Sequence, residues 1–193
     1  RLIGVFEFKD LPTFSQHKSK GELTFVITGS LCTRQGVDGI TYFFSELYKS
    51  LPKNCRVIIA GRTPKSKVIE LCLRHSNVEL VPNPKDMNSV ISKGDIYICP
   101  TRLGGGLKLR VMDGLRLGLP VITHTCSSRG YDLFCQSPFF KSFSNPEDFK
   151  LGIDSLLKLY IENKIRKEII YNKYSETFSY ESGLNRLRKI FMD

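Results

Sequence analysis

Short apolar runs alternate with segments of helical periodicity along most of this chain, and this alternation limits the folds open to it. The residues that follow the first run, 37–51, place their apolar side chains at helical spacing. Strands that alternate with helices form βαβ units, and near-continuous apolar strands suit a parallel sheet covered on both faces. We therefore expect an α/β fold, a Rossmann-like, doubly wound parallel sheet with helices on both faces. The apolar runs are residues 23–29, 56–61, 77–81, 95–100, 119–125 and 139–143.

The chain has the size of one domain, because 193 residues can bury a core of their own. Residues 9–21, KDLPTFSQHKSKG, are polar and interrupted by Pro12 and Gly21, so we expect a connector over residues 1–20 and a single domain over residues 21–193. The first residue is Arg1 rather than Met, and we expect the chain to be cut from a longer polypeptide.

The last part of the chain, from about residue 145 to 193, reads as helical. Asn145 is suited to an N-cap, with Pro146 at the first helical position and acidic residues in the first turn. Two more helical stretches are expected at about residues 163–177 and 180–192.

The composition favours a globular protein that attracts anions. The net charge is +10, from 29 Lys and Arg against 19 Asp and Glu, which raises the local concentration of anions of any kind. No basic stretch is interleaved with aromatic residues, so nucleic acid is not expected as a partner. No apolar run approaches the roughly eighteen residues of a membrane span. We expect a cytoplasmic protein, and the basic charge leaves peripheral association with the inner face of the membrane open.

Neither cysteine nor histidine spacing predicts a metal site. The six cysteines include no CxxC pair, and the three histidines show no ligand spacing with one another or with the cysteines. We expect reduced thiols in or near the core, and neither a metal nor a cofactor.

The segment TRLGGGLKLRVMDGLRLGLPVIT, residues 101–123, contains the strongest candidate for a ligand site. It leaves a strand at Pro100 and is expected to become helical near Leu107, with three glycines in the turn between them. Glycine lets a backbone approach a ligand, and the free amides at a helix start attract anions. Lys108 and Arg110 diverge by about 200° on a straight helix, so only Lys108 is expected to face the turn. A turn without a ligand stays open as the alternative.

Asp113 follows in the same helix and has two interpretations. Its carboxylate could accept hydrogen bonds from two neighbouring hydroxyl groups, as a ribose offers. It could equally be a surface residue paired with Arg110 or Arg116. Position alone does not separate these two interpretations.

Four segments together resemble the group 1 family of retaining GT-B glycosyltransferases. GGGLKLRVMDGLRLGLPVIT resembles the family's donor-site segment, and FVITGSLCTRQGVDGITYFFSEL resembles its first strand, glycine loop and helix. VIIAGRTP is similar to its second strand, and NVELVPNPKDMNSVISKGDIYICPTR to the stretch before the donor motif. The resemblance covers residues 23 to about 132.

The resemblance implies the C-terminal, donor-binding half of a GT-B enzyme that takes a UDP- or GDP-type sugar without a metal. It implies a hexosyltransferase acting on a glycan, lipid-linked or other acceptor, which an N-terminal domain outside this chain would bind. Asp113 would bind the ribose, the glycine turn and basic side chains the diphosphate, and the loop after the third strand the base. Catalytic residues are not assigned. The implied donor-binding residues are Gly29, Ser30, Arg34, Arg62, Pro82, Asn83, Gly104, Gly105, Gly106, Lys108 and Asp113.

Three positions depart from the family's pattern. Gly105 stands where many members have a glutamate that contacts the sugar, and Ser30 and Gln35 stand where many have the arginine and lysine of a diphosphate clamp. Arg34 and Arg62 are the candidates to replace those cations.

Three other functions stay open. They are a GT-B nucleotide-sugar epimerase, for which His124 is the sole nearby histidine, a non-catalytic module that binds a nucleotide sugar or another anion, and, on charge alone, a nucleic-acid binder.

Overall fold

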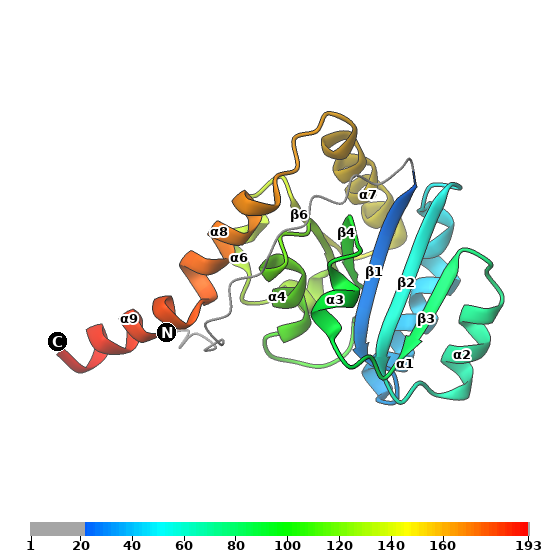
Figure 1. The fold of residues 1–193 in the computed structure, drawn as a ribbon, viewed down its shortest axis with the longest axis horizontal. Coiled ribbons are helices and arrows are strands. Elements are labelled where there is room, and N and C mark those ends of the chain that lie inside the picture. Colours follow the sequence, from blue (N-terminus) through cyan, green and yellow to red (C-terminus); the bar gives the residue numbers. More distant parts are fainter. Residues whose placement is uncertain (1–21, 193) are drawn as a thin grey trace.

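The fold is built on one parallel sheet. The computed structural model describes residues 22–192, so the expected connector over residues 1–20 lies outside the described residues. The sheet has six strands in the order β3-β2-β1-β4-β5-β6, which confirms the Rossmann-like, doubly wound arrangement (Figure 1). Each strand overlaps an apolar run that was predicted to be a strand. The strands are β1 (Leu23–Ser30), β2 (Cys55–Arg62), β3 (Val78–Pro82), β4 (Ile96–Cys99), β5 (Val121–His124) and β6 (Phe140–Phe143).

Helices cover both faces of this sheet, as expected, and each face has its own apolar core. One core lies under α1 (Arg34–Tyr42), α2 (Ser66–Leu73) and α7 (Pro146–Ile161). The other lies under α3 (Met87–Ile91), α4 (Leu109–Arg116), α6 (Asp132–Cys135) and α8 (Lys167–Phe178). The near-continuous burial of β1, β2 and β4 explains their apolar sequences, because both faces of these strands are covered.

The observed helices differ from the predicted ones in two respects. The stretch predicted at 37–51 begins earlier, at Arg34, and after Tyr42 it continues as a π-helical turn (Phe43–Leu47) and a 3-10 turn (Tyr48–Ser50). Thr33 caps α1, because its hydroxyl oxygen accepts a hydrogen bond from the Gly36 amide at 3.2 Å. Two short helices, α5 (Thr125–Ser128) and α6, were not predicted.

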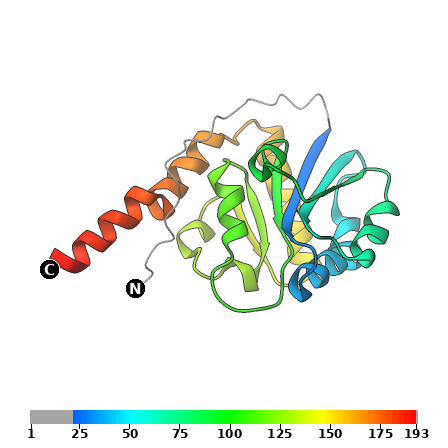
Figure 2. The same ribbon diagram turned by 60° about the horizontal axis from the view of Figure 1, so that its bottom comes forward.

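The C-terminal helices extend the molecule beyond the sheet. α7 begins after Asn145, whose side-chain oxygen accepts a hydrogen bond from the Asp148 amide at 2.8 Å, which confirms the predicted cap. α8 packs against α4, and α9 (Tyr180–Met192) projects away from the sheet (Figures 1 and 2). None of the helices formed by residues 22–192 is long and apolar enough to cross a membrane.

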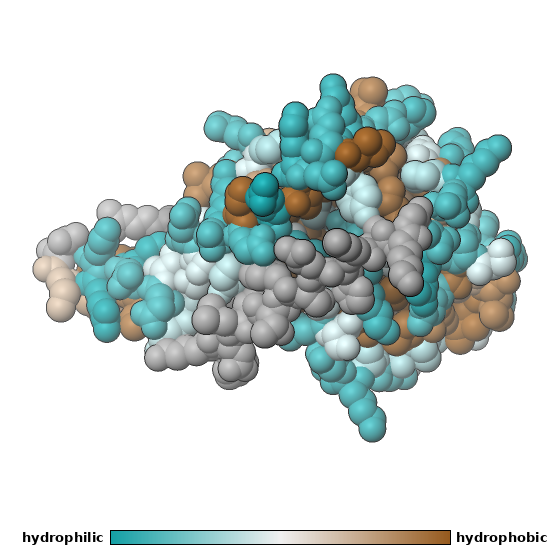
Figure 3. All heavy atoms as spheres, turned by 45° about the horizontal axis from the view of Figure 1, so that its top comes forward, coloured by the Kyte–Doolittle hydropathy of each residue, from teal (hydrophilic) through white to brown (hydrophobic). Residues whose placement is uncertain are grey.

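The surface is mostly hydrophilic on the face drawn in Figure 3, with hydrophobic residues gathered towards its right-hand edge. That is the side on which Figure 1 places α2 and β3. α2 leaves Leu73 80% exposed there.

Candidate functional site

The sheet reverses its strand order between β1 and β4, and ligands of such sheets bind outside the carboxyl ends of the strands at that point. The carboxyl ends of β1, β2 and β3 point to the bottom of Figure 1, and Figure 2 turns this edge towards the viewer. β1 ends at Ser30 and β4 ends at Cys99, directly before the glycine-rich loop. The topology therefore places the glycine-rich loop beside the loop that follows β1.

Tight glycine contacts hold this edge together. A β-carbon on Gly36 would lie 1.8 Å from the carbonyl oxygen of Ser30, so the start of α1 presses directly on the end of β1. Gly104 has a φ of +87° and Gly106 one of +72°, a region that favours glycine. A β-carbon on Gly105 would meet no described atom within 4 Å. The loop thus bends at two glycines and presents the third to open space.

Lys108 turns its side chain back into the glycine loop, as the sequence predicts. The side chain is buried, with 9% exposed, and its amino group donates a hydrogen bond to the carbonyl oxygen of Gly105 at 3.0 Å. The same amino group would lie 3.1 Å from a β-carbon on Gly104. Residues 22–192 place no carboxylate within salt-bridge distance of it. A buried ammonium group with only a carbonyl partner suits an anion-binding site.

The helical-spacing argument that separated Lys108 from Arg110 does not hold, although the Lys108 amino group does face the glycine turn and the Arg110 guanidinium group lies against Gly29 instead. α4 begins at Leu109 rather than near Leu107, and Lys108 precedes it with an extended backbone (φ −92°, ψ 97°), so helical spacing does not apply to Lys108 and Arg110. The Tyr131 hydroxyl group holds Lys108 in this position by donating to its carbonyl oxygen at 2.7 Å.

Arg110 reaches the same edge from the first turn of α4. A β-carbon on Gly29 would lie 2.5 Å from Nη1 and 2.8 Å from Cζ of Arg110, so the guanidinium group lies against the backbone at the end of β1. Nη1 donates a hydrogen bond to Oγ1 of Thr101 at 3.2 Å. Thr101 is itself buried, and its carbonyl oxygen accepts from the Ser127 hydroxyl at 2.6 Å. Sequence reasoning did not place Arg110 or Thr101 in the site.

Asp113 lies one turn further along α4 and is partly buried. The next residue, Gly114, packs against the Tyr97 ring, since a β-carbon there would lie 2.7 Å from the ring. Burial raises the pKa of Tyr97, and the charges of Cys99 and Asp113 add to the effect. Asp113 therefore lies close to Tyr97, a residue of the strand β4 that ends at the glycine loop.

Hydrogen bonds link the loop after β2 to the loop after β3. Asn83 has a φ of +48°, its side-chain oxygen accepts from the Thr63 amide at 2.9 Å, and its own amide donates to the Gly61 carbonyl at 2.9 Å. Pro82 and Asn83 are both exposed. A base bound there would meet backbone groups more readily than the Asn83 side chain, which already has a partner.

The two arginines expected to replace missing cations stay at the periphery. Arg34 is exposed at the start of α1, and Arg62 is exposed at the end of β2. The Arg62 carbonyl accepts a hydrogen bond from the Leu31 amide at 3.0 Å. Ser30 is partly buried, with its hydroxyl 3.3 Å from the Cys32 sulfur.

A polar cluster that the sequence did not reveal lies next to the glycine loop. Arg102 makes two hydrogen bonds to the Asp38 carboxylate, at 2.9 and 3.1 Å, and its guanidinium carbon lies 4.4 Å from the centre of the Tyr42 ring. His124 packs edge-on against the same ring. Burial lowers the pKa of His124, and the charge of Arg102 lowers it further. Since the Arg102 charge is paired, this cluster is a poorer anion site than Lys108 and Arg110.

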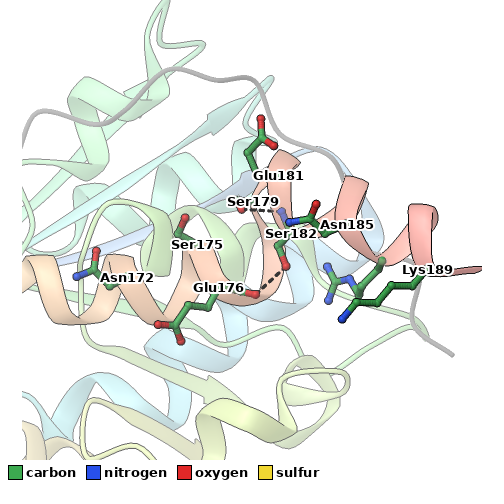
Figure 4. Close-up of a pocket in the computed structure, with 9 residues that line it drawn as sticks. Asn172, Ser175, Glu176, Ser179, Glu181, Ser182, Asn185 and Lys189 are labelled. Carbon is green, nitrogen blue, oxygen red and sulfur yellow. Dashed lines mark hydrogen bonds between the residues drawn. The ribbon is translucent and has the colours of Figure 1, made fainter.

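A separate hollow lies where α8 meets α9 (Figure 4). Ser182 links the two helices at this hollow. Its amide donates a hydrogen bond to the Ser179 hydroxyl at 3.2 Å, and its hydroxyl donates one to the Glu176 carbonyl at 2.6 Å. These bonds cap the start of α9 and fix the bend between the two helices. The hollow is thus accounted for by helix geometry.

The described residues give no indication of a metal centre. Among residues 22–192, no three His, Cys, Asp or Glu side chains gather closely enough to hold a metal ion. The six cysteines are free thiols, and Cys135 is exposed rather than in or near the core.

Sequence comparison relates the chain to known proteins. The glycosyl transferases group 1 family matches residues 22–158. An uncharacterized glycosyltransferase of Haemophilus influenzae is 22% identical over 162 residues, which are 78% of this chain and 45% of that protein. The phosphatidylinositol N-acetylglucosaminyltransferase gpi3 subunit of Schizosaccharomyces pombe is 24% identical over 181 residues, 90% of this chain and 39% of that protein. The chain thus spans less than half the length of these relatives.

Structural comparison shows the same fold. A mutant of S. aureus TarM, solved with Fondaparinux, alpha-GlcNAc-glycerol and UDP, superposes with a TM-score of 0.72 at 15% identity. The match covers 96% of this chain and 38% of TarM.

Proposed function

Because the chain belongs to the glycosyl transferases group 1 family, we propose that it forms the donor-binding half of a glycosyltransferase and binds a nucleoside diphosphate sugar. The observation that carries this proposal is the buried Lys108 ammonium group, which faces a glycine loop at the start of α4. The UDP bound in the structure of TarM, a protein of the same fold, supports it.

The diphosphate of the donor would bind at the glycine loop. Gly105 and Gly106 leave the loop backbone open to a close approach, because a β-carbon on either would meet no described atom within 4 Å. The amides at a helix start lack partners within the helix and attract anions. The negative charge of the phosphates would neutralise the positive charge of the Lys108 ammonium group. A hydrogen bond between two charged groups is roughly twice as strong as one between neutral groups.

The ribose would bind to Asp113 and the base near Pro82 and Asn83. A carboxylate can accept hydrogen bonds from both hydroxyl groups of a ribose. The backbone of the loop after β3 would contact the base, because the Asn83 side chain is engaged by Thr63.

In the transfer reaction, the diphosphate leaves as negative charge develops on it. Fixed amides and cations stabilise such charge in the transition state more than in the ground state, and they need no metal for this. We infer a retaining transfer of a hexosyl group from a UDP- or GDP-type donor, as the family resemblance implies. The acceptor, a glycan or a lipid-linked molecule, would bind to a part of the protein outside this sequence. A cytoplasmic location stays a prediction.

Gly105 favours one competing function. It stands where the resemblance expects a glutamate for the sugar, and its missing side chain leaves open space. A non-catalytic module that binds a nucleotide sugar would keep the diphosphate and ribose contacts and lack this sugar contact.

Titration with UDP, GDP and ADP, then with their sugar forms, tests the proposal by calorimetry. Asp113→Ala should weaken the preferred nucleotide by roughly ten- to a hundredfold, because a hydrogen bond to a charged group contributes about 1.5 to 3 kcal/mol. Deoxyribose forms of the same nucleotide should bind the wild type less well, and Asp113→Ala should discriminate less between the two forms. Equal binding of all forms by both proteins would contradict the ribose assignment.

A further inference from the structure

The Arg110 guanidinium group lies beside the loop after β1, at the place where the family resemblance would lead us to expect a cation from that loop. Ser30 and Gln35, the positions that the family resemblance would give to a diphosphate clamp, carry no charge. The Gln35 amide group is packed against Gly104, since a β-carbon there would lie 2.2 Å from its nitrogen. The Arg110 guanidinium group reaches the backbone at the end of β1, although it comes from the opposite side of the switch point.

The guanidinium group of Arg110 is positioned but not neutralised. Nη1 is tied to Thr101, and Thr101 is tied to Ser127, so a short chain of hydrogen bonds fixes one side of the group. Within residues 22–192, Thr101 accepts the one hydrogen bond that this guanidinium group donates, although the group has five N–H donors. No carboxylate of the described residues lies within salt-bridge distance of it.

Two cations that no carboxylate of residues 22–192 neutralises thus lie at one edge of the sheet. Lys108 faces Gly104 and Gly105 after β4, and Arg110 faces Gly29 at the end of β1. Two positive charges in a partly buried site repel each other and lose part of their hydration, and both effects cost free energy. An anion with two charged groups reduces both costs, because it pairs with each cation. Arginine in particular presents paired N–H groups that match phosphate oxygens.

We propose that Arg110 is a phosphate ligand of this site, where it acts with Lys108 and replaces the cations missing from the β1 loop. Gly29 is then required because a side chain there would displace the guanidinium group. The exposed Arg34 and Arg62 are not needed for this role. The inference rests on the proposed function and adds a ligand to it.

Binding of UDP, inorganic pyrophosphate and uridine to wild type and to Arg110→Gln tests this inference by calorimetry. UDP and pyrophosphate should bind Arg110→Gln about tenfold more weakly or worse, since a charge-assisted bond is lost, whereas uridine should bind equally. Arg74→Gln removes one exposed positive charge at the end of α2 and should leave all three affinities unchanged. Thermal unfolding checks that each variant is folded.

Arg110→Lys extends the test. This variant keeps the positive charge but not the paired N–H donors, so UDP should bind it several-fold more weakly than wild type, and the affinity for uridine should not change. If Arg110→Gln does not fold, Arg110→Lys takes its place in the test. Wild-type affinity for UDP in the folded variants would overturn the Arg110 assignment and leave the proposed function standing. An equal loss of uridine and UDP would also overturn it, because it would indicate a structural role. Failure of the wild type to bind any of these ligands would overturn both proposals.

Discussion

Gly29 and Gly61 face each other in register at the carboxyl ends of β1 and β2, and a β-carbon on Gly61 would lie 1.8 Å from the Gly29 carbonyl oxygen. The Arg110 guanidinium group lies against the same glycine, because a β-carbon on Gly29 would lie 2.5 Å from its Nη1. The close approach of two strands and the placement of a cation therefore depend on one backbone position.

Gly61→Ala should destabilise the protein and disturb this edge of the sheet. The new methyl group meets backbone that cannot move away cheaply, and overpacking of this kind typically costs about 1 to 3 kcal/mol. The free energy of unfolding in urea measures the cost. Gly105→Ala is the matched control, because its methyl group would enter open space. Equal stability of the two variants would contradict the described packing of β1 against β2.

Asn145→Ala should destabilise α7 by about 0.5 to 2 kcal/mol, since the Asp148 amide loses its acceptor at the helix start. Chemical denaturation of the variant measures this loss. Asn145→Ser keeps an oxygen at the cap and should retain most of the stability. A loss as large in the serine variant would show that the asparagine has a role other than capping.

His124 should make the fold less stable in acid. Burial, with a further contribution from Arg102, lowers the pKa of His124 in the folded protein, while the unfolded chain keeps a value of about 6.5. The unfolded state therefore binds more protons as the pH falls below about 6.5, and the stabilisation present above that pH is lost. The Asp38 carboxylate acts in the opposite direction and reduces the effect.

The pH dependence can be assigned with His124→Asn, which keeps a side-chain acceptor for the Cys126 amide at the start of α5. Unfolding free energies of both proteins at pH 5 to 8 should diverge as the pH is raised, with the wild type showing the steeper rise. Parallel curves would mean that His124 does not titrate differently in the two states.

The sequence predicted the sheet better than the site. Apolar runs revealed the strands because burial on both faces leaves little room for polar residues, and the glycine loop and Lys108 were located in the same way, from local pattern. Arg110 was missed because a helix that starts near Leu107 would turn it away from the site, whereas α4 begins at Leu109 and the Arg110 guanidinium group lies against Gly29, which is far away in the sequence. Helices α5 and α6 have four residues each, too few to show a helical period.

The paired hydroxyl groups of Thr28 and Tyr97, 2.6 Å apart beneath the switch point, give the last prediction. Both residues are buried, at 4% and 0% exposure, so neither hydroxyl can turn to water if the other is removed. Thr28→Val and Tyr97→Phe should each cost about 1 to 3 kcal/mol, because each leaves one buried hydroxyl group without its partner. The double variant removes both polar groups and should cost less than the sum by about 0.5 to 3 kcal/mol. Urea unfolding of the four proteins completes the cycle, and strict additivity would mean that the two hydroxyl groups do not stabilise each other.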